Sequence, residues 1–212
     1  MRLILVRHGD APAGFHGVIG GHHGCTGLTP LGRRQAAALR DYLSETRRVR
    51  ADVLLASELA RAIETASIIA PAFGFETFAQ ECDLCELHPG ESDGLTWTEY
   101  ANRYGSFNME SEPDRVFAPG GESWTTFHER VRRMLERLAK EYTDEHVVAV
   151  CHAGVIVASM RVLLDIRHPD NEAQMRPTNT GLTEWEYDPA SDRWTLHSFN
   201  ETSHLHDLRG DG

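Results

Sequence analysis

Short apolar runs separated by longer amphipathic segments make up most of the chain. Three runs, residues 2–6, 52–56 and 146–150, have the length of strands and predict buried β-strands. Residues 183–187 and 194–199 alternate apolar and polar positions, which predicts two antiparallel strands with a turn at Asp188 and Pro189. Residues 75–80 fit a short edge strand.

Apolar positions at helical spacing predict helices between these strands. A helix over 30–46 begins at Thr29, a good cap, and Pro30, which suits the first helical position. Ser57 is expected to cap a second helix over 58–73, and a further helix follows at 153–164. The strongest pattern, over 122–142, places Trp124, Phe127, Val131, Met134, Leu135 and Leu138 on one face.

Two segments show no clear period. Residues 9–29 form a loop rich in Gly and His, and residues 84–120 are irregular apart from a short helix near 96–104. The tail from Glu201 is polar and is expected to fray. Strands alternating with helices predict an α/β fold with three α/β/α layers around a mostly parallel sheet. We expect one domain over 1–212, with an insertion at about 84–120 covering the active site.

The charge balance narrows the possible partners. A formal net charge of -11 argues against binding to nucleic acid or to anionic membrane surfaces, although converging arginines can still attract a small anion. No stretch reaches the ~20 apolar residues of a membrane span, and the first apolar run is too short for a signal peptide. Four cysteines are too few for a disulfide scaffold, so we expect a cytoplasmic location.

Two histidines occupy equivalent positions after predicted strands. His8 follows the strand over 2–6 and His152 follows the strand over 146–150; Arg7 and Arg61 are expected at the same sheet edge. Ligands of parallel α/β sheets bind beyond the carboxyl ends of strands. Two arginines match the oxygens of a tetrahedral anion, and a histidine can attack phosphorus. The pattern therefore predicts phosphoryl chemistry.

Six segments, in order, resemble the histidine phosphatase superfamily, also called phosphoglycerate mutase-like. A lone Arg-His-Gly is a weak signal, but six ordered segments covering nearly the whole chain are a strong one. They are RHG at 7–9, SELARAIETA at 57–66, LCE at 84–86 with Gly90 and DGLT at 93–96, PGGES at 119–123, VCHAGV at 150–155, and NTGL at 179–182.

The resemblance implies a role for each site residue. His8 would carry the phosphoryl group, while Arg7, Arg61 and His152 would hold it and Glu86 would protonate the leaving oxygen. Ala153 and His22 complete the expected substrate-binding set. The implied activity is a phosphatase acting on a small phosphorylated metabolite, without metal or cofactor because the arginines supply the positive charge.

Departures from the family pattern favour a phosphatase over a mutase. Mutases resemble ERHYG at the acid segment, whereas Glu86 is followed here by LHPG. Gly14 stands where the family often has asparagine, and His16, His22 or His23 are candidate replacements. Ser92 replaces the tryptophan of the family's WEG, which predicts a more open pocket wall near Glu86.

Several alternatives stay open. Asp83, Glu91 and Asp93 compete with Glu86 as the acid, and the three loop histidines fit a metal site less well than a solvated loop. The pair Cys82 and Cys85 suggests redox or zinc chemistry only weakly, because no second pair accompanies it. The arginines at 130, 132, 133 and 137 are expected on a solvated helix face.

The function alternatives are a mutase-type phosphotransferase and a non-catalytic module on the same fold. The sequence does not decide which substrate is used, whether two copies form a homodimer, or whether residues 95–118 move as a lid. Candidate contacts to the leaving group within that segment are Arg103, Tyr104 and Arg115.

Overall fold

A six-stranded sheet forms the centre of the molecule in the computed structural model, which describes residues 1–13, 17–166, 174–206 and 208. The strands lie in the order β3-β2-β4-β1-β5-β6. Pairings among β1, β2, β3 and β4 are parallel, while β5 and β6 are antiparallel. The strands are β1 (Arg2–Arg7), β2 (Val53–Ala56), β3 (Ala79–Gln80), β4 (His146–Cys151), β5 (Leu182–Asp188) and β6 (Arg193–Glu201).

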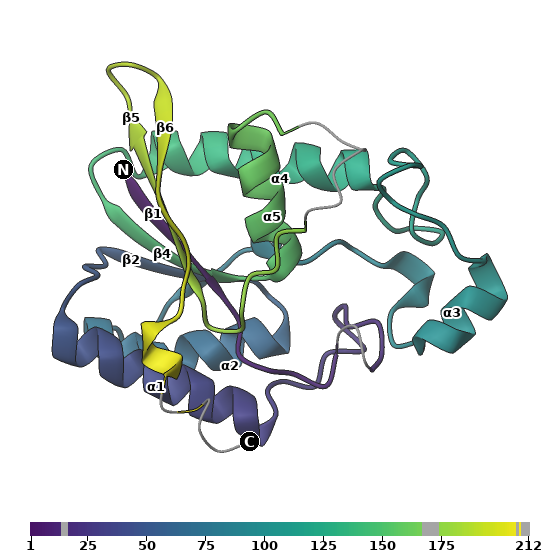
Figure 1. The fold of residues 1–212 in the computed structure, drawn as a ribbon, viewed down its shortest axis with the longest axis horizontal. Coiled ribbons are helices and arrows are strands. Elements are labelled where there is room, and N and C mark those ends of the chain that lie inside the picture. Colours follow the sequence, from purple (N-terminus) through teal and green to yellow (C-terminus); the bar gives the residue numbers. More distant parts are fainter. Residues whose placement is uncertain (14–16, 167–173, 207, 209–212) are drawn as a thin grey trace.

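Helices cover both faces of this sheet, which confirms the predicted α/β architecture (Figure 1). Alternate positions of the central strands face opposite layers, so Leu3 and Leu5 pack with one helix pair and Ile4 and Val6 with the other. The helices are α1 (Pro30–Thr46) and α2 (Ala60–Ile69) on one face, α4 (Trp124–Glu141) and α5 (Ala153–Leu163) on the other, and α3 (Trp97–Tyr104) at one side.

The register of β1 against β4 brings the two histidine segments together. Arg7 pairs with Cys151, so His8 and His152 are the next residues along two neighbouring strands. The His8 amide donates to the Cys151 carbonyl at 3.0 Å. Both side chains therefore leave the sheet at the same edge, as expected from the ends of parallel strands.

Three of the predicted element bounds differ in the structure. Helix α2 begins at Ala60, with Leu59 and not Ser57 at the cap, and its final turn becomes a 3-10 helix over Ala70–Phe73 that contains Pro71. The predicted strand over 75–80 is reduced to two residues. The described tail is less frayed than predicted, because Leu205 is buried within the 3-10 helix Ser203–Leu205.

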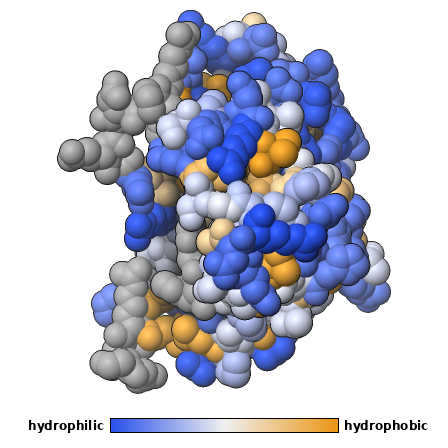
Figure 2. Space-filling view, turned by 90° about the vertical axis from the view of Figure 1, so that its right-hand side faces the viewer, coloured by the Kyte–Doolittle hydropathy of each residue, from blue (hydrophilic) through white to orange (hydrophobic). Residues whose placement is uncertain are grey.

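Residues 84–120 lie beside the carboxyl ends of β1 and β4, which are followed by His8 and His152 (Figure 1). Tyr100 and Phe117 stack at 4.5 Å and pack with Ile19 from the first loop in a small separate cluster. Seen from this side, the surface is mainly hydrophilic with a few hydrophobic patches (Figure 2). Within the described residues, no helix has the length and apolar character needed to cross a bilayer.

Candidate active site

His8 is buried at the end of β1 with its two ring nitrogens in different environments. Its Nδ1 lies 2.6 Å from the Gly9 carbonyl oxygen, which can only accept, so the proton of the neutral ring is on Nδ1. Nε2 therefore carries a lone pair, and it accepts a hydrogen bond from Arg61 Nε at 3.1 Å. This tautomer presents Nε2 as a nucleophile.

The backbone around His8 is held from two sides. Asn179 Nδ2 donates to the His8 carbonyl at 3.0 Å, and the Thr180 amide donates to the Arg7 carbonyl at 2.9 Å. On the other side, the Gly9 amide donates to Thr65 Oγ1 at 3.0 Å. The ring is thus positioned by neighbours from a late loop and from α2, which limits the directions from which Nε2 can attack.

Arg61 and Arg7 reach the same place from α2 and β1. Arg61, only 4% exposed, also donates from Nη1 to the Gly20 carbonyl at 2.8 Å. Arg7 donates from Nη1 to the Pro177 carbonyl at 2.6 Å, whereas its buried Nε has no hydrogen-bond partner among the described residues. A half-buried guanidinium whose Nε–H has no such partner is suited to bind an anion.

His152 completes this group at the end of β4. Its ring centroid lies 5.0 Å from that of His8, and its buried Nδ1 is likewise without a partner in the described part of the chain. Nε2 lies 2.7 Å from Ser57 Oγ. His152 is also the N-cap of α5, where the helix dipole favours negative charge. Since the Ser57 hydroxyl donates to Cys85 Sγ, it accepts from His152 Nε2, and Nδ1 of the neutral His152 ring carries a lone pair that becomes a donor when the ring gains a proton. Arg7, Arg61 and a protonated His152 can together hold a tetrahedral anion next to His8.

Ser57 has a different role from the predicted helix cap. Its hydroxyl is fully buried between His152 Nε2 and Cys85 Sγ, which lies 3.3 Å away. The SELARAIETA motif contains this serine, but sequence alone gave it a capping function. The contact across 95 residues between Ser57 and His152 arises only from the pairing of β2 with β4.

Glu86 lies at this site through a close approach to α5. Its Oε2 accepts from the Gly154 amide at 3.0 Å, two residues beyond His152. A β-carbon at Gly154 would be 2.0 Å from Glu86 Oε1, so this position must be glycine for the carboxylate to stay there. Glu86 is also close enough to Arg7 to oppose, by its negative charge, the lowering of the Arg7 pKa that burial causes.

The three competing carboxylates have other partners. Glu91 is exposed and pairs with Arg103 at 3.4 Å, and Asp83 faces Arg137 at 3.5 Å. Asp93 accepts three backbone hydrogen bonds, each 2.8 Å, from the amides of Gly21, His23 and Gly24. These contacts favour Glu86 as the carboxylate that serves the anion site.

Of the remaining predicted site residues, Ala153 lies next to His152, whereas the described histidines and arginines are exposed and have other neighbours. Ala153 is the first residue of α5, directly beside His152. His22 and His23 are exposed on the first loop, and His22 faces Cys82 and Cys85, so no described contact joins it to His8. His16 lies outside the described residues. Arg103 and Arg115 are exposed and pair with Glu91 and Glu112 of their own segment.

Arg130 contradicts the prediction of a solvated helix face. It is 7% exposed and forms a two-armed ion pair with Glu122, both contacts being 2.8 Å. The same guanidinium donates to the carbonyls of Asp83, Cys85 and Glu86 at 2.8, 2.9 and 3.2 Å. Arg130 therefore holds the backbone of the segment that presents Glu86. Helical spacing placed it correctly on α4, but could not show that this segment covers it.

Comparison with known proteins identifies the family. The histidine phosphatase superfamily (branch 1) matches residues 3–202. The chain is a member of this superfamily. It is 30% identical over 208 residues to the Arabidopsis thaliana phosphoglycerate mutase-like protein 4, covering 96% of this chain and 86% of that protein. It is also 30% identical over 207 residues to the metal-independent phosphoserine phosphatase of that plant, covering 96% and 82%.

A solved structure agrees with this placement. Phosphoserine phosphatase from Entamoeba histolytica, in complex with 3-phosphoglyceric acid, superposes with a TM-score of 0.76 at 28% identity. The match covers 96% of this chain and 98% of that one. The predicted membership and the predicted class, a phosphatase of the histidine phosphatase superfamily, are thereby confirmed.

Replacing Arg130 by methionine should destabilise this histidine phosphatase. The change would remove the arginine partner of the mostly buried Glu122 carboxylate, and breaking a buried ion pair in this way typically costs about 3–5 kcal/mol. For a chain of this size, that corresponds to a melting temperature lower by roughly 6–20 °C. Arg133→Met is the matched control, because Arg133 is exposed on the same helix and should change little. Equal melting temperatures for the two variants would contradict the role of Arg130.

Stability of the fold should decline as the pH falls below 6.5. Burial first, and then the charge of Arg61, holds the pKa of both His8 and His152 well below the ordinary value. Between that ordinary value and the lowered one, only the unfolded chain binds these protons, so unfolding becomes easier by about 1.4 kcal/mol per pH unit for each histidine. The penalty is absent above pH 6.5.

Urea unfolding at pH 7.5, 6 and 5 measures this effect. His152→Asn should remove part of the pH dependence in this range, since asparagine does not titrate. Burial also lowers the pKa of His204 to about 4. His204→Asn is therefore the comparison variant: it removes a different titrating histidine and should leave the pH dependence that His8 and His152 cause in place. A free energy of unfolding that stays constant from pH 7.5 to 5 in the native protein would show that the two site histidines are not buried as neutral rings.

Proposed function

We propose that this protein hydrolyses the phosphomonoester of a small metabolite through a covalent phosphohistidine on His8. The observation that carries the proposal is the state of His8: a buried ring with its proton held on Nδ1 by Gly9, and a lone pair on Nε2. Arg7 Nε and His152 Nδ1, from the neighbouring residues of the site, have no hydrogen-bond partner among the described residues. A nucleophile, an anion site and a candidate acid thus surround one point.

In the first step, His8 Nε2 attacks phosphorus opposite the ester oxygen. The N–P bond forms as the P–O ester bond breaks, and Glu86 gives a proton to the departing oxygen, so the alcohol leaves neutral. Arg61 Nε, which rests on Nε2 at 3.1 Å, is then free to donate to a phosphoryl oxygen. Arg7 donates to a second oxygen, and His152, which takes up a proton from solvent at Nδ1 as the anion binds, donates to a third, so these groups offset the charge of the phosphoryl oxygens in the transition state.

In the second step, water attacks the phosphohistidine. Glu86, now ionised, accepts a proton from that water, the P–N bond breaks, and inorganic phosphate leaves His8 as it began. The Nδ1 hydrogen bond to Gly9 supports the developing positive charge on the imidazole during each step. The arginines supply the positive charge, so the reaction needs no metal ion.

The names of the relatives guide the choice of substrate. One acts on phosphoserine without metal, another is a 5''-phosphoribostamycin phosphatase from Niallia circulans, and a third is a glucosyl-3-phosphoglycerate phosphatase. Each name denotes a small phosphorylated molecule. We infer a substrate of this class for the present chain, with one phosphomonoester group and a soluble leaving alcohol.

A substrate panel tests the proposal. Purified protein is assayed with chelator against p-nitrophenyl phosphate, O-phosphoserine, 3-phosphoglycerate and a phosphorylated aminoglycoside, and released phosphate is measured. We expect turnover that chelator leaves unchanged, with one metabolite preferred. Transfer of the phosphoryl group between phosphoglycerates after bisphosphoglycerate priming, without phosphate release, would support a mutase in place of a phosphatase. No reaction with any compound would support a non-catalytic module.

A further inference from the structure

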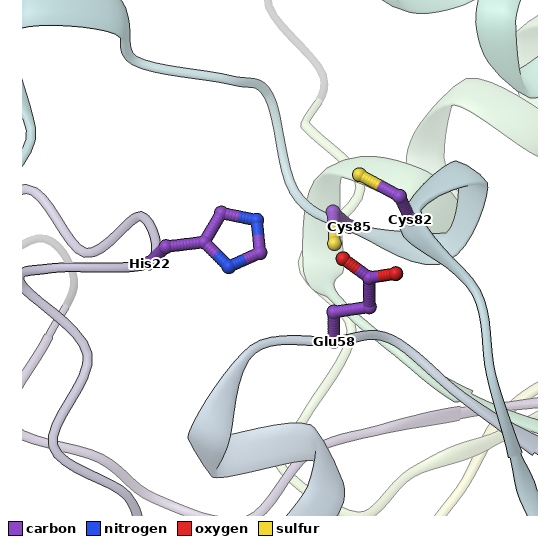
Figure 3. A group of neighbouring side chains, drawn as sticks. All are labelled: His22, Glu58, Cys82 and Cys85. Carbon is purple, nitrogen blue, oxygen red and sulfur yellow. The ribbon is translucent and has the colours of Figure 1, made fainter.

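Four side chains beside the anion site converge without a role in the proposed reaction. His22 comes from the first loop, Glu58 from the turn before α2, and Cys82 and Cys85 from the turn after β3; Figure 3 shows them facing one another. One potential ligand atom from each lies within 4.8 Å of all the others. Two sulfur atoms, one imidazole nitrogen and one carboxylate oxygen form a donor set typical of zinc.

We propose that His22, Glu58, Cys82 and Cys85 bind a zinc-class divalent cation. A tetrahedral ion with Zn–S bonds of about 2.3 Å and Zn–N bonds of about 2.0 Å needs ligand atoms roughly 3.3–3.8 Å apart. Ligand atoms at most 4.8 Å apart therefore need to approach one another by about 1–1.5 Å at most. His22 and Glu58 are exposed and can supply this closure by side-chain rotation, while Cys85 is buried and fixed.

The backbone at each side of the site is already held in place. Asp93 fixes the turn that carries His22 through its three hydrogen bonds to the amides of residues 21, 23 and 24. Arg130 fixes the turn of Cys82 and Cys85 by donating to carbonyls within it, and the Cys85 amide closes that turn on the Cys82 carbonyl at 2.8 Å. Ligands on fixed turns lose little freedom when an ion binds.

The surrounding groups supply outer contacts that metal thiolates commonly have. His88 Nε2 lies 3.5 Å from Cys82 Sγ, and His88 Nδ1 lies 3.7 Å from a carboxylate oxygen of Glu122. Ser57 Oγ donates to Cys85 Sγ at 3.3 Å. Hydrogen bonds to sulfur stabilise the thiolate form that a metal requires, so these outer partners fit a bound ion.

Redox chemistry is the competing interpretation of the cysteine pair. All four cysteines of the chain are free thiols in this structure, and a disulfide between Cys82 and Cys85 would need neither His22 nor Glu58. The convergence of those two side chains on the thiols favours a cation. It also explains why sequence spacing gave only a weak zinc signal: the second pair of ligands comes from segments about 60 and 24 residues earlier.

Metal binding is tested on the full chain after removal of metals and reduction of thiols. Isothermal titration with zinc gives stoichiometry and affinity, and Co²⁺ absorption gives the thiolate charge-transfer and tetrahedral bands. We expect one ion per chain with both cobalt signatures. Cys82→Ser or Cys85→Ser should lower the zinc affinity more than about 100-fold, and His22→Ala, Glu58→Gln or His88→Ala about 10–100-fold.

Matched controls separate this site from others. His23→Ala alters the exposed histidine next to His22, and Cys25→Ser alters a neighbouring thiol outside the donor set; both should bind zinc within about twofold of the native protein. His8→Ala should also bind one zinc ion, which separates this proposal from the hydrolytic one. If Cys85→Ser does not fold, Cys82→Ser and the exposed-ligand variants still decide. Absence of thiolate-to-cobalt absorption, or unchanged affinity in Cys82→Ser, would overturn the proposal.

Discussion

Replacement of His8 by alanine should lower kcat by about 10⁴–10⁶-fold while leaving the protein folded. Loss of a covalent nucleophile removes the whole two-step route, and single removals of this kind in other enzymes cost amounts of this order. Arg7, Arg61 and His152 remain in the variant, so the anion site keeps its donors. Steady-state assays on the best metabolite of the panel measure the loss.

Binding measurements distinguish loss of chemistry from loss of the site. Inorganic phosphate should still bind to His8→Ala, with an affinity within about tenfold of native, because the groups that hold oxygen are unchanged. His197→Ala is a comparison at an exposed histidine of β6 whose Nε2 lies 2.6 Å from a carboxylate oxygen of Glu186, and it should retain most activity. A His8→Ala variant with more than a tenth of native turnover would exclude His8 as the nucleophile.

Replacement of Glu86 by glutamine should have an effect that depends on the leaving group. Alkyl alcohols such as serine are poor leaving groups and need a proton, so kcat on phosphoserine-type substrates should fall about 10²–10⁴-fold. p-Nitrophenolate leaves readily without a proton, so its release should fall much less. Glutamine can still occupy the space beside Gly154, so the fold should be preserved.

Asp83→Asn and Glu91→Gln are the matched controls for Glu86. Both carboxylates belong to the same segment and pair with exposed arginines, so each variant should stay within about twofold of native on every substrate. Equal losses on alkyl and aryl substrates in Glu86→Gln would contradict proton donation by Glu86. A selective loss on alkyl substrates in Asp83→Asn would move that role to Asp83.

Strand and helix patterns were sufficient to predict most of the fold and the meeting of His8 with His152. Buried parallel strands have short apolar runs, and the residue after each run must lie at the shared carboxyl edge. Residues 2–6 and 146–150 could therefore be paired before their register was known. Bounds were less predictable where a proline changed the last helical turn after α2, or where an edge strand kept only two residues.

Contacts between distant segments account for what the sequence could not predict. Ser57 was expected to cap a helix, because a serine before a helix usually does so, yet its hydroxyl bonds to His152. Arg130 was expected in solvent, because a charged face on an amphipathic helix usually is. Only the path of residues 82–86 across α4 buries it, and that path has no local sequence signal.

The most direct test of the account is to trap the phosphoenzyme. Native protein is mixed with labelled substrate, quenched in alkali within one turnover, and digested, and the labelled peptide is sequenced by mass spectrometry. We predict a phosphoryl group on His8 that is stable in alkali and lost in acid, and that is absent from His8→Ala. Single-turnover hydrolysis without any labelled peptide, or a label on His152, Glu86 or another residue, would contradict a phosphohistidine at His8.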